Sequence, residues 1–112
     1  MAIGDRYEAR LAGPAYLGTT TTTLYTVPAG FQAVIKQIII CNTDTVDRTV
    51  TLAIGSAATG SNRFMSALPI GANDLMVFDT ALFLTTAETF QGLSDAASLV
   101  TVTAVGWTKQ IA

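Results

Sequence analysis

The chain has 112 residues, of which 50% are hydrophobic and only 12% charged; it has no histidine, one cysteine and a net charge of −2. This length supports one hydrophobic core, and the charged share is well below the roughly 25% usual for soluble domains. An acidic, charge-poor chain argues against a nucleic-acid partner, and no apolar run approaches the ~18 residues of a membrane helix.

The first segment, residues 1–18, differs from the rest of the chain. Asp5 and Glu8 have the spacing of a capping box, which indicates one or two helical turns stopped by Gly13 and the proline after it. Its large apolar side chains are too many for a solvated tail. We therefore predict an N-terminal arm that docks on its own domain or on a neighbouring subunit. The expected anchors of this arm are Tyr7, Leu11, Tyr16 and Leu17.

Residues 19–112 alternate between apolar and polar positions in short segments, which are separated by Gly, Pro, Asn, Asp and Ser. This is the pattern of antiparallel strands joined by tight turns. The expected strands cover residues 21–27, 31–41, 48–54, 63–68, 75–79, 81–84, 89–93 and 99–107. We therefore predict an all-β fold: a single antiparallel β-sandwich or jelly-roll-like domain of about eight strands.

The strand expected at residues 31–41 is apolar on both faces near its end, where Ile38 and Ile40 alternate with Ile39 and Cys41. A strand of this kind is central in its sheet or covered by a partner. Surplus apolar surface in a chain with few charges has a natural destination in another subunit. The expected subunit contacts of the sandwich are Ile38, Ile40 and Trp107, while Cys41 is expected to act as a small hydrophobe.

Few residues could carry chemistry. Nucleophilic and acid–base catalysis need paired titratable groups, and Asp74 and Asp79 would lie on opposite faces of a strand, about 16 Å apart. Asp44 and Asp47 flank a turn with Asn42 and could share Ca²⁺, but an Asx-turn explains these residue types without an ion. We predict no catalytic residue, no metal and no cofactor.

Several motifs recur together in residues 20–107. They are Leu-Tyr-Thr-Val-Pro-Ala-Gly at 24–30, a hydrophobic strand at 33–40, Cys-Asn-Thr at 41–43, a Thr/Val strand at 49–54, Glu-Thr-Phe at 88–90 and a closing Val/Thr strand. In this order they resemble small accessory virion proteins of tailed bacteriophages. The resemblance implies a β-sandwich part of the virion: a head decoration (cement) protein, or a neck, tail, fibre or baseplate subunit.

Composition and resemblance lead to the same expectation. We expect a non-enzymatic structural protein of the phage virion that is assembled in the host cytoplasm and binds the particle exterior as a homo-oligomer, in particular a trimer. Its other partners would be virion proteins such as the major capsid or tail proteins, with no nucleic acid and no membrane. The alternative is a tail-tip or fibre module that binds host glycan, which requires exposed aromatic side chains near residues 55–62 or 95–98.

Overall fold

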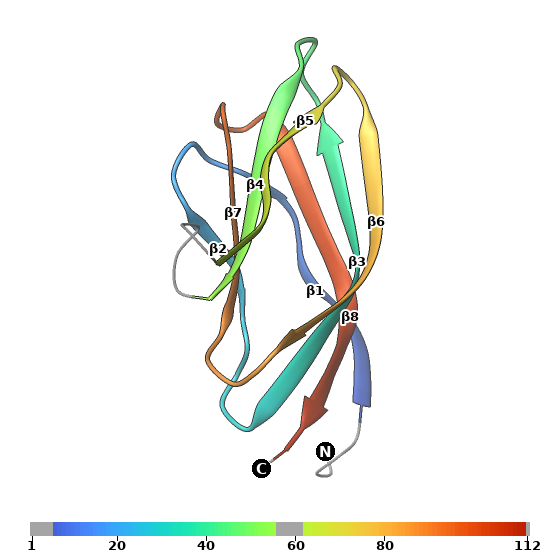
Figure 1. Cartoon of the computed structure of the whole chain (residues 1–112). Coiled ribbons are helices and arrows are strands. Elements are labelled where there is room, and N and C mark those ends of the chain that lie inside the picture. Colours follow the sequence, from blue (N-terminus) through green and yellow to red (C-terminus); the bar gives the residue numbers. More distant parts are fainter. Residues whose placement is uncertain (1–5, 56–61, 112) are drawn as a thin grey trace.

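In a computed structural model the chain folds into eight strands, and this confirms the predicted all-β class (Figure 1). The structure describes residues 6–55 and 62–111. The strands are β1 (Arg6–Tyr16), β2 (Thr22–Thr26), β3 (Phe31–Asn42), β4 (Arg48–Gly55), β5 (Arg63–Ile70), β6 (Leu75–Leu84), β7 (Thr89–Ser94) and β8 (Val100–Gln110). Among the described residues, no helix is long and apolar enough to cross a membrane.

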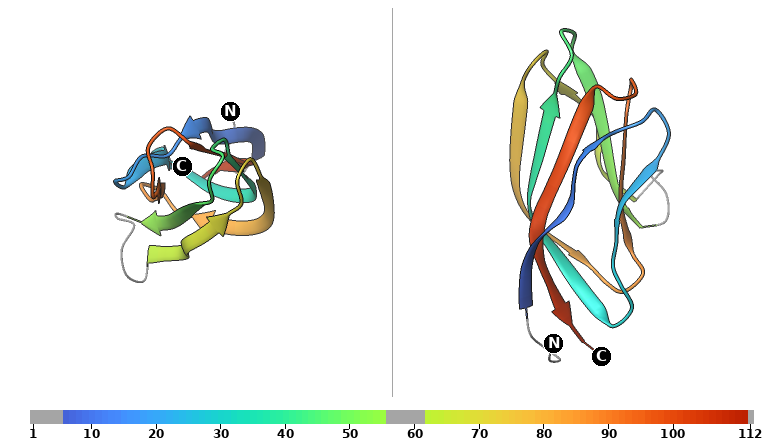
Figure 2. Two further views of the ribbon diagram at one scale, coloured as in Figure 1. Left: turned by 90° about the horizontal axis from the view of Figure 1, so that it is seen from above. Right: turned by 180° about the vertical axis from the view of Figure 1, so that it is seen from behind.

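The strands form two four-stranded sheets packed face to face. The first sheet has the order β1-β8-β3-β6 and the second the order β2-β7-β4-β5. The pairing is nested: β1 pairs with β8, β2 with β7, β3 with β6 and β4 with β5, all antiparallel. The chain is thus one long hairpin rolled into two layers, which is the jelly roll. The left-hand view of Figure 2 shows these layers end on.

The core lies between the two sheets and is filled by alternate side chains of their inner faces. Phe90 of β7 is fully buried, and its ring stacks on Phe64 of β5 with centroids 6.2 Å apart. Gly92 lies beside Phe90 in the same layer, where a Cβ would approach Leu52 Cδ2 to 2.8 Å and Leu17 Cδ2 to 3.2 Å. The glycine therefore leaves room for two leucine side chains, Leu17 after β1 and Leu52 of β4.

The N-terminal segment is a strand, so the helical turns expected there are wrong for the described residues. β1 pairs with β8 from Arg6–Lys109 to Tyr16–Thr101 and forms one edge of the first sheet; Asp5 lies outside the described residues. A capping box stabilises a helix by only about 1 kcal/mol, which a ladder along an 11-residue strand outweighs. Of the two docking alternatives, the segment takes its own sandwich. The division into an arm (residues 1–18) and a sandwich domain (residues 19–112) stays a prediction.

β1, β3 and β6 have register shifts at one level of the first sheet, which we call the bulge line; β1 has a further shift between Ala12 and Ala15. β1 has an extra residue between Arg10 and Ala12, and β3 has one between Ile35 and Gln37. β6 has an extra residue at the same place: Asp79 and Leu82, three residues apart, pair with Gln37 and Ile35 of β3, two residues apart. Each bulge moves the following side chains to the other face.

The bulge line explains why the sequence predicts two short strands where the structure has the single strand β6. Residues 75–79 and 81–84, expected as two strands, are the two halves of β6 on either side of it. The predicted number of about eight strands is nevertheless right, because two differences cancel: β6 replaces two expected strands, and β1 is a strand where an arm was expected.

Candidate subunit interface

The outer face of the first sheet is uncovered among the described residues (Figure 2, right). Residues opposite each other in a ladder point to the same face, so the register defines rows of side chains across this face. We call the two rows nearest the β3–β4 and β5–β6 turns the apolar band. It consists of Tyr16, Thr101, Cys41 and Leu75 in one row and Thr103, Ile39 and Val77 in the next.

The apolar band presents large side chains to solvent. Tyr16, Leu75 and Val77 are 56%, 54% and 50% exposed, and Ile39 and Cys41 between them are half-buried. Leu75 and Val77 belong to β6, which has β3 on one side and no partner strand among the described residues on the other. A long apolar edge strand beside an apolar patch is the kind of surface that associates with another chain.

Below the bulge line, towards the start of β1 and the end of β8, the same face becomes basic. We call Arg6, Arg10, Lys36 and Lys109 the basic face; the register places Arg6 beside Lys109 and Arg10 beside Val105. The guanidinium carbon of Arg6 lies 4.6 Å from the centre of the Trp107 ring. Arg6, Lys36 and Trp107 line an open depression of about 660 Å³. Cation–π contact of this kind holds Arg6 against the sheet.

The opposite end of the sandwich is acidic. It carries the β3–β4, β5–β6 and β7–β8 turns. We call Asp44, Asp47, Asp74 and Asp95 the acidic end. Arg48 is the basic side chain among them, and one of its guanidinium nitrogens lies 2.6 Å from Asp44 Oδ2 and another 3.8 Å from Asp95 Oδ2. The hydrogen bond from Arg48 holds the pKa of the Asp44 carboxyl below its usual range, and the backbone N–H of Thr45 adds to this effect.

The turns at the acidic end are tied together by Asn42, the last residue of β3. Its side chain is fully buried, and Nδ2 donates to the carbonyl oxygens of Val46 (2.9 Å), Ile70 (3.1 Å) and Gly71 (3.2 Å). Its Oδ1 accepts from the backbone N–H of Asp44 at 3.0 Å, which is an Asx-turn. Both carboxylate oxygens of Asp44 also accept hydrogen bonds within the protein, Oδ1 from the Thr45 N–H and Oδ2 from Arg48. No group of three or more His, Cys, Asp or Glu side chains in residues 6–55 and 62–111 could hold a metal.

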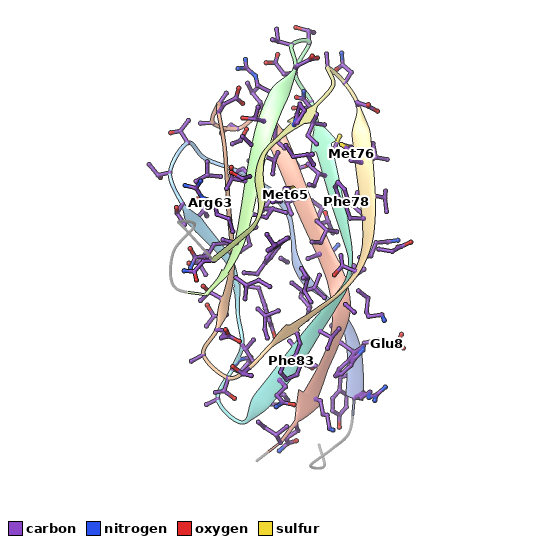
Figure 3. The ribbon with its side chains drawn as sticks, in the orientation of Figure 1. Glu8, Arg63, Met65, Met76, Phe78 and Phe83 are labelled. Carbon is purple, nitrogen blue, oxygen red and sulfur yellow. The ribbon has the colours of Figure 1, made fainter. Side chains whose placement is uncertain are left out.

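An apolar groove lies between the edge strands β5 and β6, where Figure 3 shows Met65 and Phe78. It has a volume of about 400 Å³ and is lined by Phe64, Leu68 and Leu82 as well. Asp79 is the titratable side chain of its lining. A single carboxyl without a second acid, base or nucleophile cannot provide paired acid–base chemistry.

Leu17, a predicted anchor of the N-terminal arm, is 1% exposed and packs in the core of its own sandwich. Two of the predicted subunit contacts, Ile38 and Ile40, are 1% and 0% exposed within the chain itself, which corrects their assignment. Alternation along β3 shows two apolar faces but not which of them meets the second sheet. The face left open carries Ile39 and Cys41.

The other predicted contacts have mixed positions. Tyr16 lies in the apolar band, and Trp107 lies beside the basic face. Tyr7 and Leu11 are half-buried, and Leu11 packs against the core. Leu75 and Val77 were missed, although residues 75–78 (Leu-Met-Val-Phe) are apolar on both faces in the same way as residues 38–41.

Comparisons with known proteins identify the fold. No protein-family model and no curated protein matches the chain. A subunit of the Bacillus endospore appendages, described as disulfide-linked pili, superposes with a TM-score of 0.57 at 11% identity over 99% of this chain and 93% of that one. The capsid structure of the Helicobacter pylori bacteriophage KHP30 gives 0.52 at 10% identity over 99% and 90%. The coat protein dimer of Tobacco streak virus gives 0.51 at 10% identity over 96% and 86%. At these identities the likeness shows a shared fold.

Proposed function

We propose that this chain is a non-enzymatic structural protein of a bacteriophage virion, which assembles through the outer face of its first sheet. The observation that carries the proposal is the apolar band, an uncovered face on which Tyr16, Leu75 and Val77 are at least half exposed. Surfaces of this kind in a folded domain mark contacts with other proteins. The fold is compatible with this role, since two of the similar structures are viral coat or capsid proteins.

The single cysteine favours a virion over a disulfide-linked pilus. A linear polymer of disulfide-linked subunits needs at least two cysteines in each subunit, one for each neighbour. This sequence contains only Cys41, which is a free thiol in the structure. Copies of this chain would therefore stop at disulfide-linked dimers, and larger assemblies must be held by non-covalent contacts.

Within the virion we favour a decoration (cement) role as a homo-oligomer, with a trimer as the expected form and a neck, tail or fibre position as the alternative. The sequence motifs at residues 24–30 and 88–90 support an accessory component of a tailed phage. Glycan binding is less favoured, because Phe64, the aromatic residue that follows residues 55–62, is only 39% exposed and its ring stacks on buried Phe90. Of the loop at residues 55–62, residues 56–61 lie outside the described residues.

The double substitution Leu75→Ser with Val77→Ser tests the proposal. We expect it to weaken self-association about 100-fold, because two apolar side chains that contribute roughly 1.5 kcal/mol each would no longer be buried between copies. Sedimentation velocity over a concentration series measures the change, and co-sedimentation with purified phage particles measures binding to the virion.

Phe64→Ser is the control. Phe64 is 39% exposed but lies on β5 of the second sheet, away from the apolar band, the basic face and the acidic end. We expect it to change self-association less than about 3-fold. If the double variant is folded by circular dichroism and associates as tightly as the wild-type protein, the apolar band is not the assembly surface.

A further inference from the structure

We propose that copies of this chain associate head to tail, with the acidic end of one copy docked on the basic face of the next. This inference rests on the proposed function and specifies the partner of its assembly surface. The observation behind it is the separation of charge along the molecule, which is elongated, with extents of 47 × 25 × 19 Å.

Most of the positive charge lies on one surface. The chain has six Lys and Arg residues, and four of them form the basic face. The nearest acidic side chains on the same face are Glu8, opposite Trp107, and Asp79, which accepts a hydrogen bond from Gln37 at the far edge. Among the described residues, four positive and two negative charges give this part of the face a net charge of about +2.

The negative charge lies at the other end. The acidic end has four carboxylates and one cation, Arg48, so its net charge is −3. Asp47, Asp74 and Asp95 are exposed. Hydrogen bonds join the turns of Asp47 and Asp74: the Asn73 N–H donates to Asp44 O at 2.9 Å and the Ala72 N–H to Asp47 Oδ1 at 3.0 Å. Figure 1 shows these turns at the end of the sandwich opposite the start of β1 and the end of β8.

This polarity selects the geometry of the contact. A two-fold contact through the basic face alone would place like charges together, which is costly, whereas a heterologous contact pairs different surfaces of identical copies. The depression beside Trp107 and Lys36 gives a protruding turn room to enter. Arg and Trp are the residue types that dominate binding energy in interfaces. The apolar band lies next to the basic face on the same sheet, so one neighbouring copy can contact both.

Two charge-reversal variants test the contact. The face variant carries Arg10→Glu and Lys36→Glu; the end variant carries Asp47→Lys and Asp74→Lys. We expect each alone to associate at least 10-fold more weakly than wild type in 50 mM salt, because its two surfaces then carry the same sign. Mixed in equal amounts, the two should regain wild-type association within about 3-fold, since the reversed face of one matches the reversed end of the other.

Thr26→Glu and Thr26→Lys on β2 are the controls, because they change net charge at an exposed position of the second sheet. Sedimentation velocity with one fluorescently labelled partner measures the strength of association for each variant alone and for the mixture. Folded variants that associate like wild type, or a mixture that fails to recover, would overturn the head-to-tail contact. Wild-type protein that stays monomeric yet binds phage particles would overturn it while the virion role stands. A monomer that also ignores particles would refute both.

Discussion

Gly106→Ala is expected to destabilise the protein by about 3 kcal/mol or more. Gly106 lies in β8 at the bulge line, opposite Ile35 of β3. A Cβ at this position would lie 1.9 Å from the carbonyl oxygen of Val34 and 2.9 Å from its carbonyl carbon. Both atoms belong to the backbone of the neighbouring central strand. A side-chain rotation cannot relieve this contact, so the β3–β8 ladder would have to separate there.

The same substitution is expected to impair assembly. Gly106 is flanked by Val105 and Trp107, which with it line the depression of the basic face. Displacing β8 from β3 therefore moves Trp107 relative to Lys36. Chemical denaturation measures the stability, and sedimentation of the folded fraction measures assembly.

Gly18→Ala provides the comparison. A Cβ on Gly18 would meet nothing closer than 3.8 Å, and the contact there is the flexible Thr22 hydroxyl. We expect this variant to remain within about 1 kcal/mol of wild type. Equal stability of the two alanine variants would show that the strands do not approach each other at Gly106 as described.

Asn42→Asp is expected to cost about 3–5 kcal/mol at neutral pH, because it places a buried charge without a partner. The substitution keeps the shape of the side chain but replaces an amide that donates to three carbonyl oxygens with a carboxylate that can only accept. Four oxygen atoms of like partial charge would then face one another in a site closed to solvent.

The pH dependence gives this prediction a second, independent readout. Burial and the three carbonyl oxygens raise the pKa of the introduced carboxyl in the folded state above its unfolded value of about 4. The protonated form is therefore favoured by folding. The destabilisation relative to wild type should be smallest below about pH 4, grow as pH rises through the raised folded pKa, and then level off.

Asn73→Asp is the matched control, because it makes the same chemical change at an exposed residue of the neighbouring turn. Its φ of 53° lies in the left-handed region, where Asn and Asp are both enriched among non-glycine residues. We expect a change below about 0.5 kcal/mol with little pH dependence. An Asn42→Asp variant as stable as this control at pH 7 would contradict the buried amide network.

The sequence could predict the fold class because alternation and turn residues are local signals. β4 is an example: Val50 and Leu52 alternate with threonine and alanine along the strand, and both lie in the core. The nested pairing was not readable in this way, since it depends on which distant strands meet. β1 was missed for the same reason, because its partner β8 lies at the other end of the chain.

The proposed assembly surface could be predicted only in part from the sequence. Apolar residues on both faces of residues 38–41 indicate a covered strand, and β3 is central in its sheet. The choice between the Ile38 face and the Ile39 face depends on the bulge at Lys36, which shifts the alternation by one residue. No local feature of the sequence marks that bulge. The basic face is likewise assembled from three strands, each of which contributes only one or two cations.

The most direct test of assembly through the outer face uses the native thiol. Cys41 is the only cysteine of the sequence and lies in the apolar band between Thr101 and Leu75. Its maleimide labelling rate can be compared between dissociated protein and the assembled oligomer or phage particle. We expect labelling to be at least about 10-fold slower in the assembled state, because neighbouring copies exclude the reagent. Equal labelling rates in the two states would contradict the claim that this face is covered.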